Sequence, residues 1–146
     1  PKVRAVIVPL LGALVVGSLT AIFTALAIAK ALGAGDTLLA SLAPKSVTAP
    51  VAIGIAESLG GAPTLTAVLV ILTGMIGAVS VTPMLNALRL KDWRARGFAT
   101  GVAAHGIGTA RAFQVNETAG AFASIGMGLN AVLTALLAPL VLRLFM

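Results

Sequence analysis

Three long apolar runs decide what this chain of 146 residues can fold into. They occupy residues 5–32, 64–88 and 119–142, and each exceeds the roughly 20 residues that a helix needs to cross about 30 Å of hydrocarbon. The chain is 59% hydrophobic and 10% charged, with a mean hydropathy of +1.09, which excludes an ordinary soluble domain. The runs predict an all-α integral membrane protein, a polytopic helix bundle.

Two further apolar stretches, residues 37–59 and 97–113, are interrupted near their middles. The segment PKSVTAP at 44–50 breaks the first, because its two prolines remove backbone donors and disfavour helix at the residue before each. Four glycines around His105 loosen the second. Each stretch is therefore either one broken spanning helix or a re-entrant hairpin, and their lengths favour two broken spanning helices.

Each interrupted stretch is followed by a polar loop and a long apolar run. Residues 43–49 align without gaps on residues 104–110, sharing two alanines and a threonine. We therefore predict one transmembrane domain over residues 1–146, with an internal repeat between 37–88 and 97–142, as in repeat-built transporters. The chain opens with proline rather than methionine, so we expect a fragment that lacks N-terminal helices.

The net charge of +6 does not predict nucleic-acid binding, because its largest cluster of cations lies between two apolar runs. That cluster is Arg89, Lys91, Arg94 and Arg96. The positive-inside rule places this loop, residues 89–96, in the cytoplasm whether the interrupted stretches span or re-enter. We expect a protein of the bacterial inner (plasma) membrane.

Polar groups concentrate at the two interruptions, where the only cations within the interrupted stretches are Lys45 and Arg111. Helices that resume after each break would direct free amides and a positive dipole end to the midplane, where they attract an anion. A short 2-hydroxy or 2-oxo acid offers the matching carboxylate. The candidate residues are Lys45, Ser46, Thr48, His105, Gly108, Thr109 and Arg111, with Glu57, Glu117 and Asn130 as secondary candidates.

Most of these residues also have a purely structural interpretation. The two cations could snorkel to the interface or pair with the two glutamates. The hydroxyls could restore broken backbone hydrogen bonds. His105 could relay a proton or pack between glycine-rich backbones, and Asn130 is favoured as an interhelical hydrogen bond rather than a ligand contact.

Enzyme chemistry is not favoured. The chain has one histidine, no cysteine and no carboxylate pair at a useful spacing. Ser46 follows Lys45 directly, and adjacent residues on a helix point apart, so the two do not make a nucleophile and its base. We predict a protein that is not an enzyme and has neither metal nor cofactor.

Three spaced motifs resemble those of the LrgB/CidB family: SLAPKSVT at residues 41–48, ILTG at 71–74 and AHGIGTAR at 104–111. The resemblance covers essentially the whole chain. It implies kinship with bacterial autolysis modulators, with proteins linked to pyruvate uptake and with the plastidic glycolate/glycerate translocator. Two departures, Ala49 in place of a second threonine and Ala119 in place of a second acidic residue, put one hydroxyl and one carboxylate contact in question.

The resemblance implies two function classes. The first is a secondary transporter of small monocarboxylates such as glycolate, glycerate or pyruvate, coupled to protons or to sodium. The second is a holin- or antiholin-like regulator of murein hydrolase activity, acting as a homo-oligomer such as a homodimer or with a small LrgA/CidA-like membrane partner. Polarity concentrated at two breaks favours the transporter, because a pore-forming oligomer needs polar helix faces.

Overall fold

The computed structural model describes the backbone of residues 2–146 and the side chains from residue 6 onward. Six helices joined by short loops make up the fold, and residues 2–146 contain no strand, which confirms the all-α prediction. The helices are α1 (Lys2–Ala31), α2 (Asp36–Leu42), α3 (Ala49–Ser58), α4 (Pro63–Ala87), α5 (Trp93–Val115) and α6 (Glu117–Leu142).

Three of the helices are long and apolar enough to cross a membrane. They are α4, α6 and the part of α1 from Val6 to Ala31, with hydropathies between 2.0 and 2.4. Large apolar side chains such as Val16, Val79 and Val132 stand exposed along them, as is expected of surfaces that face lipid. The chain is therefore an integral membrane protein.

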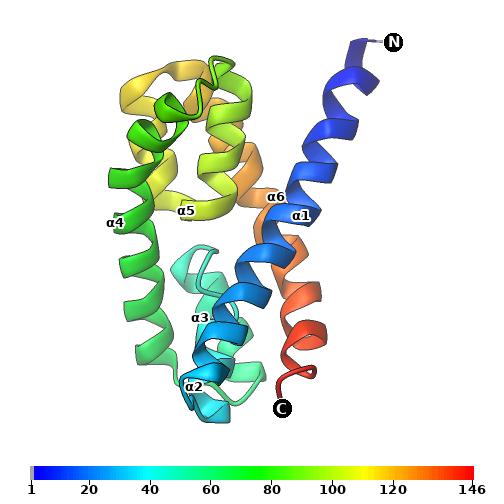
Figure 1. Ribbon diagram of the computed structural model, residues 1–146, viewed down its shortest axis with the longest axis vertical. Helices are drawn as coiled ribbons and strands as arrows, with labels where there is room; N and C mark the ends of the chain where they lie inside the picture. Colours follow the sequence, from blue (N-terminus) through cyan, green and yellow to red (C-terminus); the bar gives the residue numbers. More distant parts are fainter. Residues whose placement is uncertain (1) are drawn as a thin grey trace.

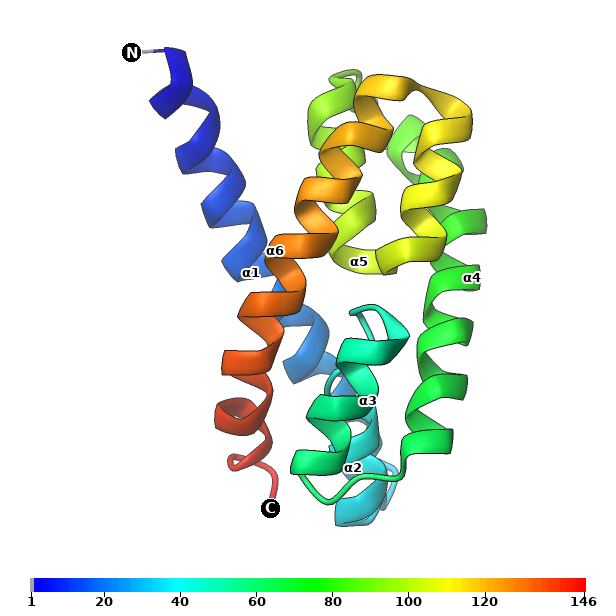
Figure 2. The ribbon, with the colours of Figure 1, turned by 180° about the vertical axis from the view of Figure 1, so that it is seen from behind.

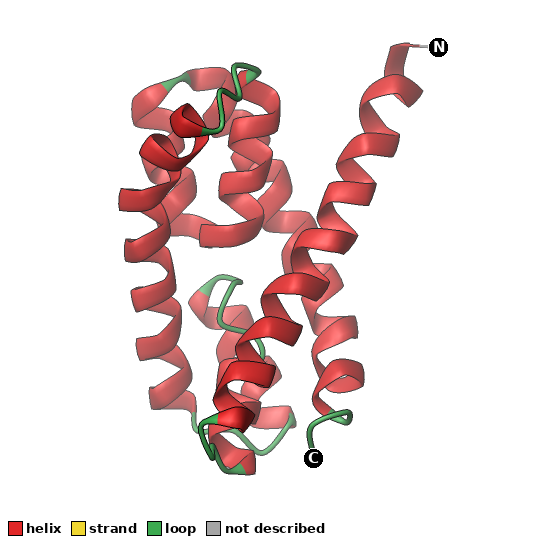
Figure 3. Ribbon diagram, viewed as in Figure 1, coloured by secondary structure: helices red, strands yellow, loops and turns green. Residues whose placement is uncertain are grey.

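The three long helices frame the molecule, with α4 on one side and α1 and α6 on the other (Figures 1 and 2). We call the end that holds the N-terminus and the α4–α5 loop the upper end, and the end that holds the C-terminus the lower end (Figure 1). The loops are confined to these two ends, except for one turn at mid-height between α2 and α3 (Figure 3).

Helices α2 and α3 form a hairpin that enters from the lower end and turns back at mid-height (Figure 2). Its base is closed by Ser41, whose Oγ accepts a 2.8 Å hydrogen bond from the amide of Ala62 and whose carbonyl accepts one from Thr66 Oγ1. The chain thus leaves α3 beside the end of α2 and begins α4 at the same end of the molecule. We call α2, α3 and residues 43–48 between them hairpin 1.

Helix α5 is also a hairpin, entering from the upper end (Figures 1 and 2). Its backbone leaves helical geometry at residues 104–105, which separates a descending arm from an ascending arm. Both outer ends lie against the start of α6, because Gly97 packs on the backbone of Ala119 and Phe113 packs on Gly120. We call α5 hairpin 2.

The expectation that both interrupted stretches cross the membrane is therefore wrong, since both are re-entrant. Helices α2 and α3 have 7 and 10 residues, or about 10 and 15 Å of helix, and neither arm reaches across about 30 Å of hydrocarbon. The 23 residues of α5 are long enough to span, but the break at 104–105 folds them in two. Lengths alone could not distinguish these outcomes.

Candidate functional site

The tip of hairpin 1 follows directly from its prolines. Tight turns at residues 43–48 are closed by the amide of Lys45 donating to Leu42 O at 3.1 Å and the amide of Val47 donating to Pro44 O at 3.2 Å. Helix α3 resumes at Ala49, with proline in its first turn, where a missing amide costs least. Its N-cap residue, Thr48, makes no side-chain capping bond, so the first amides of α3 are available to another acceptor.

Lys45 and Ser46 lie together at this tip. The Lys45 ammonium donates to Ser46 Oγ at 3.1 Å, and the Lys45 side chain is half-buried whereas Ser46 is buried. Lys45 forms no ion pair with any side chain of residues 6–146. An ammonium at membrane depth costs about 3 kcal/mol on insertion scales, and such groups mark ligand or ion sites more often than they serve packing.

His105 forms the tip of hairpin 2 in a strained conformation. Its φ of 41° lies where a residue with a β-carbon costs about 1–3 kcal/mol, so neighbouring contacts must hold it. The imidazole Nε2 lies 2.9 Å from Val70 O on α4, and Thr109 Oγ1 donates to the His105 carbonyl at 2.7 Å. A carbonyl oxygen only accepts, so Nε2 carries the proton and Nδ1 of the neutral ring is the acceptor.

Two glycines make room for this turn. A β-carbon on Gly74 of α4 would lie 2.6 Å from His105 Cε1, and one on Gly108 would lie 2.5 Å from the Ala104 side chain. The contribution of Gly108 is therefore close packing within hairpin 2. The Thr109 hydroxyl donates to the His105 carbonyl at the break. This contact matches the expectation that such hydroxyls restore backbone hydrogen bonds.

The two tips meet near mid-height from opposite ends (Figures 1 and 2). Asn130 of α6 joins them, because its Nδ2 donates to Ser46 O at 3.1 Å and to Val102 O at 3.0 Å. The start of α3 and the start of the ascending arm of α5 thus bring two positive helix ends to the middle of the molecule.

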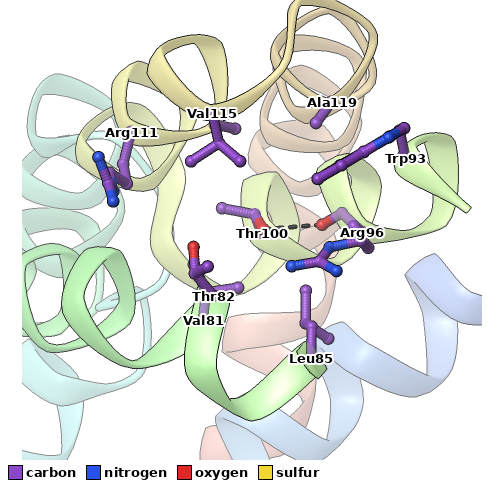
Figure 4. A pocket seen from close by; sticks show the side chains of 10 residues that line it. Val81, Thr82, Leu85, Trp93, Arg96, Thr100, Arg111, Val115 and Ala119 are labelled. Carbon is purple, nitrogen blue, oxygen red and sulfur yellow. Dashed lines mark hydrogen bonds between the residues drawn. The ribbon is translucent and has the colours of Figure 1, made fainter. Parts of the chain in front are cut away.

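Arg111 does not join this group. It follows His105 by six residues, about 9 Å up the ascending arm, and is exposed with Nη1 3.3 Å from Gln114 Oε1. It borders a cavity of about 20 Å³ near the upper end, opposite Arg96 and beside Thr82 (Figure 4). Glu57 and Glu117 are exposed, and neither pairs with Lys45 or Arg111.

Sequence reasoning missed several partners of the tips. Val70 supplies its carbonyl to His105, and a carbonyl leaves no signal in a sequence. Ser18 and Thr134 are buried hydroxyls bonded to Asn130 Oδ1, at 2.6 and 3.3 Å. Isolated hydroxyls inside apolar runs were the available signal for these two residues.

The fold and the tips define a class: a polytopic integral membrane protein with two re-entrant hairpins that meet inside the bundle. Residues 1–144 match the LrgB-like family, and the chain belongs to that family. It is 42% identical over 127 residues to the "uncharacterized protein YwbG" of Bacillus subtilis, covering 87% of this chain and 56% of that protein.

Two further relatives are similar in extent. Identity is 41% over 138 residues with YxaC of Bacillus subtilis (94% of this chain, 60% of that protein). It is 39% over 116 residues with the "holin-like protein CidB" of Staphylococcus aureus (80% and 51%). The chain thus spans about half to three fifths of the length of these relatives. No solved structure matches it.

Proposed function

We propose that the hairpin tips form an anion site through which this membrane protein transports small monocarboxylates. The observation that carries the proposal is the meeting of two helix N-terminal ends at mid-height, next to the turn that holds Lys45. Amides at a helix start donate to anions, and the low dielectric around them strengthens the attraction. A carboxylate there would neutralise the half-buried Lys45 ammonium.

The donors at the tips suit a short 2-hydroxy or 2-oxo acid. The carboxylate would take the ammonium and the open amides of α3, and the neighbouring oxygen would take the hydroxyl of Ser46 or Thr48. Glycolate, glycerate and pyruvate have this pattern. Gly108 and Thr109 contribute by shaping hairpin 2, whereas Arg111 acts nearer the upper end, where it would attract anions on their way to the tips.

His105 supplies a coupling proton in this mechanism. Its Nε2 is held by Val70 O, so a proton from the aqueous phase would bind at Nδ1 and add a positive charge beside the carboxylate. Binding would then strengthen as the pH falls, and deprotonation would favour release. Sodium coupling would instead leave His105 neutral throughout the cycle.

The arrangement of the hairpins supports alternating access. Hairpin 1 enters from the lower end and precedes α4, and hairpin 2 enters from the upper end and precedes α6 (Figure 2). This inverted relationship supports the internal repeat between residues 37–88 and 97–142, and inverted repeats build many secondary transporters. Each hairpin would close the site from its own end. The basic segment 89–96, of which residues 93–96 form the first turn of α5 rather than a loop, would place the upper end in the cytoplasm of a bacterial inner membrane.

A second candidate function is favoured by the comparisons more than the transporter is. A relative bears the name holin-like protein, which supports a membrane regulator of murein hydrolase activity and autolysis. Such a protein would act as a homo-oligomer, for example a homodimer, or with a small LrgA/CidA-like partner. It would release unrelated solutes rather than bind one class of acid, and neither function involves enzymatic catalysis.

Ligand-induced stabilisation of the purified protein tests the site. Glycolate should raise Tm in a saturable way, whereas glycolamide, which has the same shape without the charge, should not. Lys45→Met should raise the glycolate concentration needed for the same shift by roughly tenfold or more. Equal shifts with both compounds, or no shift with glycolate, glycerate and pyruvate, would contradict an anion site at the tips.

A further inference from the structure

Asn130 occupies the middle of α6 with its carboxamide fully engaged. It is 1% exposed, and its Oδ1 accepts from Ser18 Oγ at 2.6 Å and from Thr134 Oγ1 at 3.3 Å. Its Nδ2 donates to two carbonyls, those of Ser46 at 3.1 Å and Val102 at 3.0 Å. A carboxamide has two N–H donors, so both are committed to these carbonyls.

The two carbonyls belong to different hairpins. Ser46 lies at the tip of hairpin 1, directly after Lys45, and Val102 lies three residues before His105 in hairpin 2. One nitrogen atom therefore touches both halves of the candidate site. Each carbonyl lies next to a helix break, where the backbone lacks its helical partner and an unsatisfied group inside the membrane costs several kcal/mol.

The oxygen side of Asn130 fixes which way the carboxamide faces. Ser18 on α1 and Thr134 one turn along α6 both donate to Oδ1, so the NH2 group is turned toward the hairpins. Val102 lies near the end of the descending arm of hairpin 2, just before the break at residues 104–105, and Ser46 lies in the turn that carries Lys45. The Asn130 NH2 group donates to the carbonyl oxygens of both residues. The carboxamide of Asn130 thus bonds directly to both hairpins close to their tips.

We propose that Asn130 is the positioning residue that sets the spacing of the two hairpin tips, and through it the affinity for the transported carboxylate. The effect on affinity rests on the proposed transport function. The effect on the spacing of the tips does not. Movement of either hairpin breaks one of the two bonds and leaves the other. The carboxamide therefore serves as a common anchor while the site opens to one end at a time.

Two variants separate positioning from general stability. Asn130→Leu keeps approximately the size of the side chain, adds no charge and removes the carboxamide with both of its donations, whereas Ser18→Ala removes a partner of Oδ1 and leaves both donations in place. Losing both donated hydrogen bonds should weaken the affinity for the carboxylate by roughly tenfold or more. We expect Asn130→Leu to raise KM for glycolate uptake about tenfold with a smaller change in kcat, and Ser18→Ala to change KM by less than about threefold.

A distance measurement tests the spacing without relying on transport. The chain has no cysteine, so spin labels can be attached specifically at Val51→Cys in hairpin 1 and Ala103→Cys in hairpin 2, two exposed positions. Electron paramagnetic resonance should give one narrow distance in the parent and in Ser18→Ala, and a longer or broader one in Asn130→Leu. Should Asn130→Leu fail to assemble, Asn130→Gln retains the donors on a longer side chain and should lengthen the distance.

The outcomes are distinguishable. An unchanged distance in the assembled Asn130 variants would overturn the positioning role, whatever uptake shows. If the distance changes but the parent protein takes up no carboxylate, the positioning role of Asn130 holds and the proposed transport function is wrong. A changed distance with an unchanged KM would overturn the link between spacing and affinity.

Discussion

Nε2 of His105 lies 2.9 Å from the carbonyl oxygen of Val70, so the tip of hairpin 2 is tied to the first third of α4. This bond leaves Nδ1 as the only ring atom that can gain a proton. We predict that His105→Gln flattens the pH dependence of uptake, because a glutamine amide can still donate to Val70 O but does not titrate. Uptake between pH 5 and 8 is the measurement, and a profile like that of the parent would remove His105 from coupling.

Lys45 is the residue on which the proposed anion site depends most. Lys45→Met keeps the length of the side chain and removes the charge. A hydrogen bond to a charged group contributes about 1.5–3 kcal/mol, so affinity for glycolate should fall by roughly tenfold to over a hundredfold. Isothermal titration of detergent-solubilised protein measures this. The matched control is Lys91→Met in the exposed basic loop, which should leave affinity within about twofold.

Arg111 should have a smaller effect than Lys45. It lies about 9 Å along the ascending arm from His105, in an exposed position, so its interaction with a carboxylate at the tips is screened. We expect Arg111→Gln to lower the rate of uptake at low salt and to have little effect at high ionic strength. Uptake at two salt concentrations checks this. If Arg111→Gln lowered uptake as much as Lys45→Met does at both salt concentrations, Arg111 would belong to the carboxylate site at the tips.

Much of the fold could be predicted from the sequence. Apolar runs of 24 residues or more predicted the three spanning helices, and the prolines at 44 and 50 and the glycines around His105 predicted both breaks. The direction of the chain after each break could not be predicted. The prolines and glycines indicate where a helix stops, but not whether the chain continues across the membrane or turns back. Arg111 shows the same limit: its helix places it away from Lys45, although both belong to interrupted stretches.

Two glycines of α5 allow its descending arm to lie directly against the backbone of α6. A β-carbon on Gly97 or Gly101 would overlap the backbone of Ala119 or Ala123, whereas one on Gly128 would meet open space. Gly101→Ala should therefore lower the free energy of unfolding by about 1–3 kcal/mol, because the backbone must move to accept it. Denaturant unfolding in detergent measures the loss. Gly128→Ala is the control and should be neutral or stabilising; equal losses would show that helix packing is not the cause.

Asp92 caps α5 at the upper end, outside the membrane-spanning segments. Its carboxylate accepts from the Arg94 amide at 2.9 Å, and the bonds to Arg94 lower the pKa of Asp92 to about 2. Because this pKa is below the ordinary value, the cap is fully present above about pH 4 and is lost as the pH falls toward 2. Hydrogen exchange at the Arg94 amide should stay protected at pH 4, and Asp92→Asn should remove the change between pH 4 and 2. Loss of protection already at pH 4 in the parent would contradict the cap.

The most direct test of the central claim is uptake of labelled glycolate and pyruvate into proteoliposomes that hold the purified protein, with and without a proton gradient. The proposed site predicts saturable uptake that unlabelled monocarboxylates compete away, and a KM that Lys45→Met raises by roughly tenfold or more. Leakage of unrelated solutes, with no saturable uptake of either acid, would contradict it and favour the holin-like function.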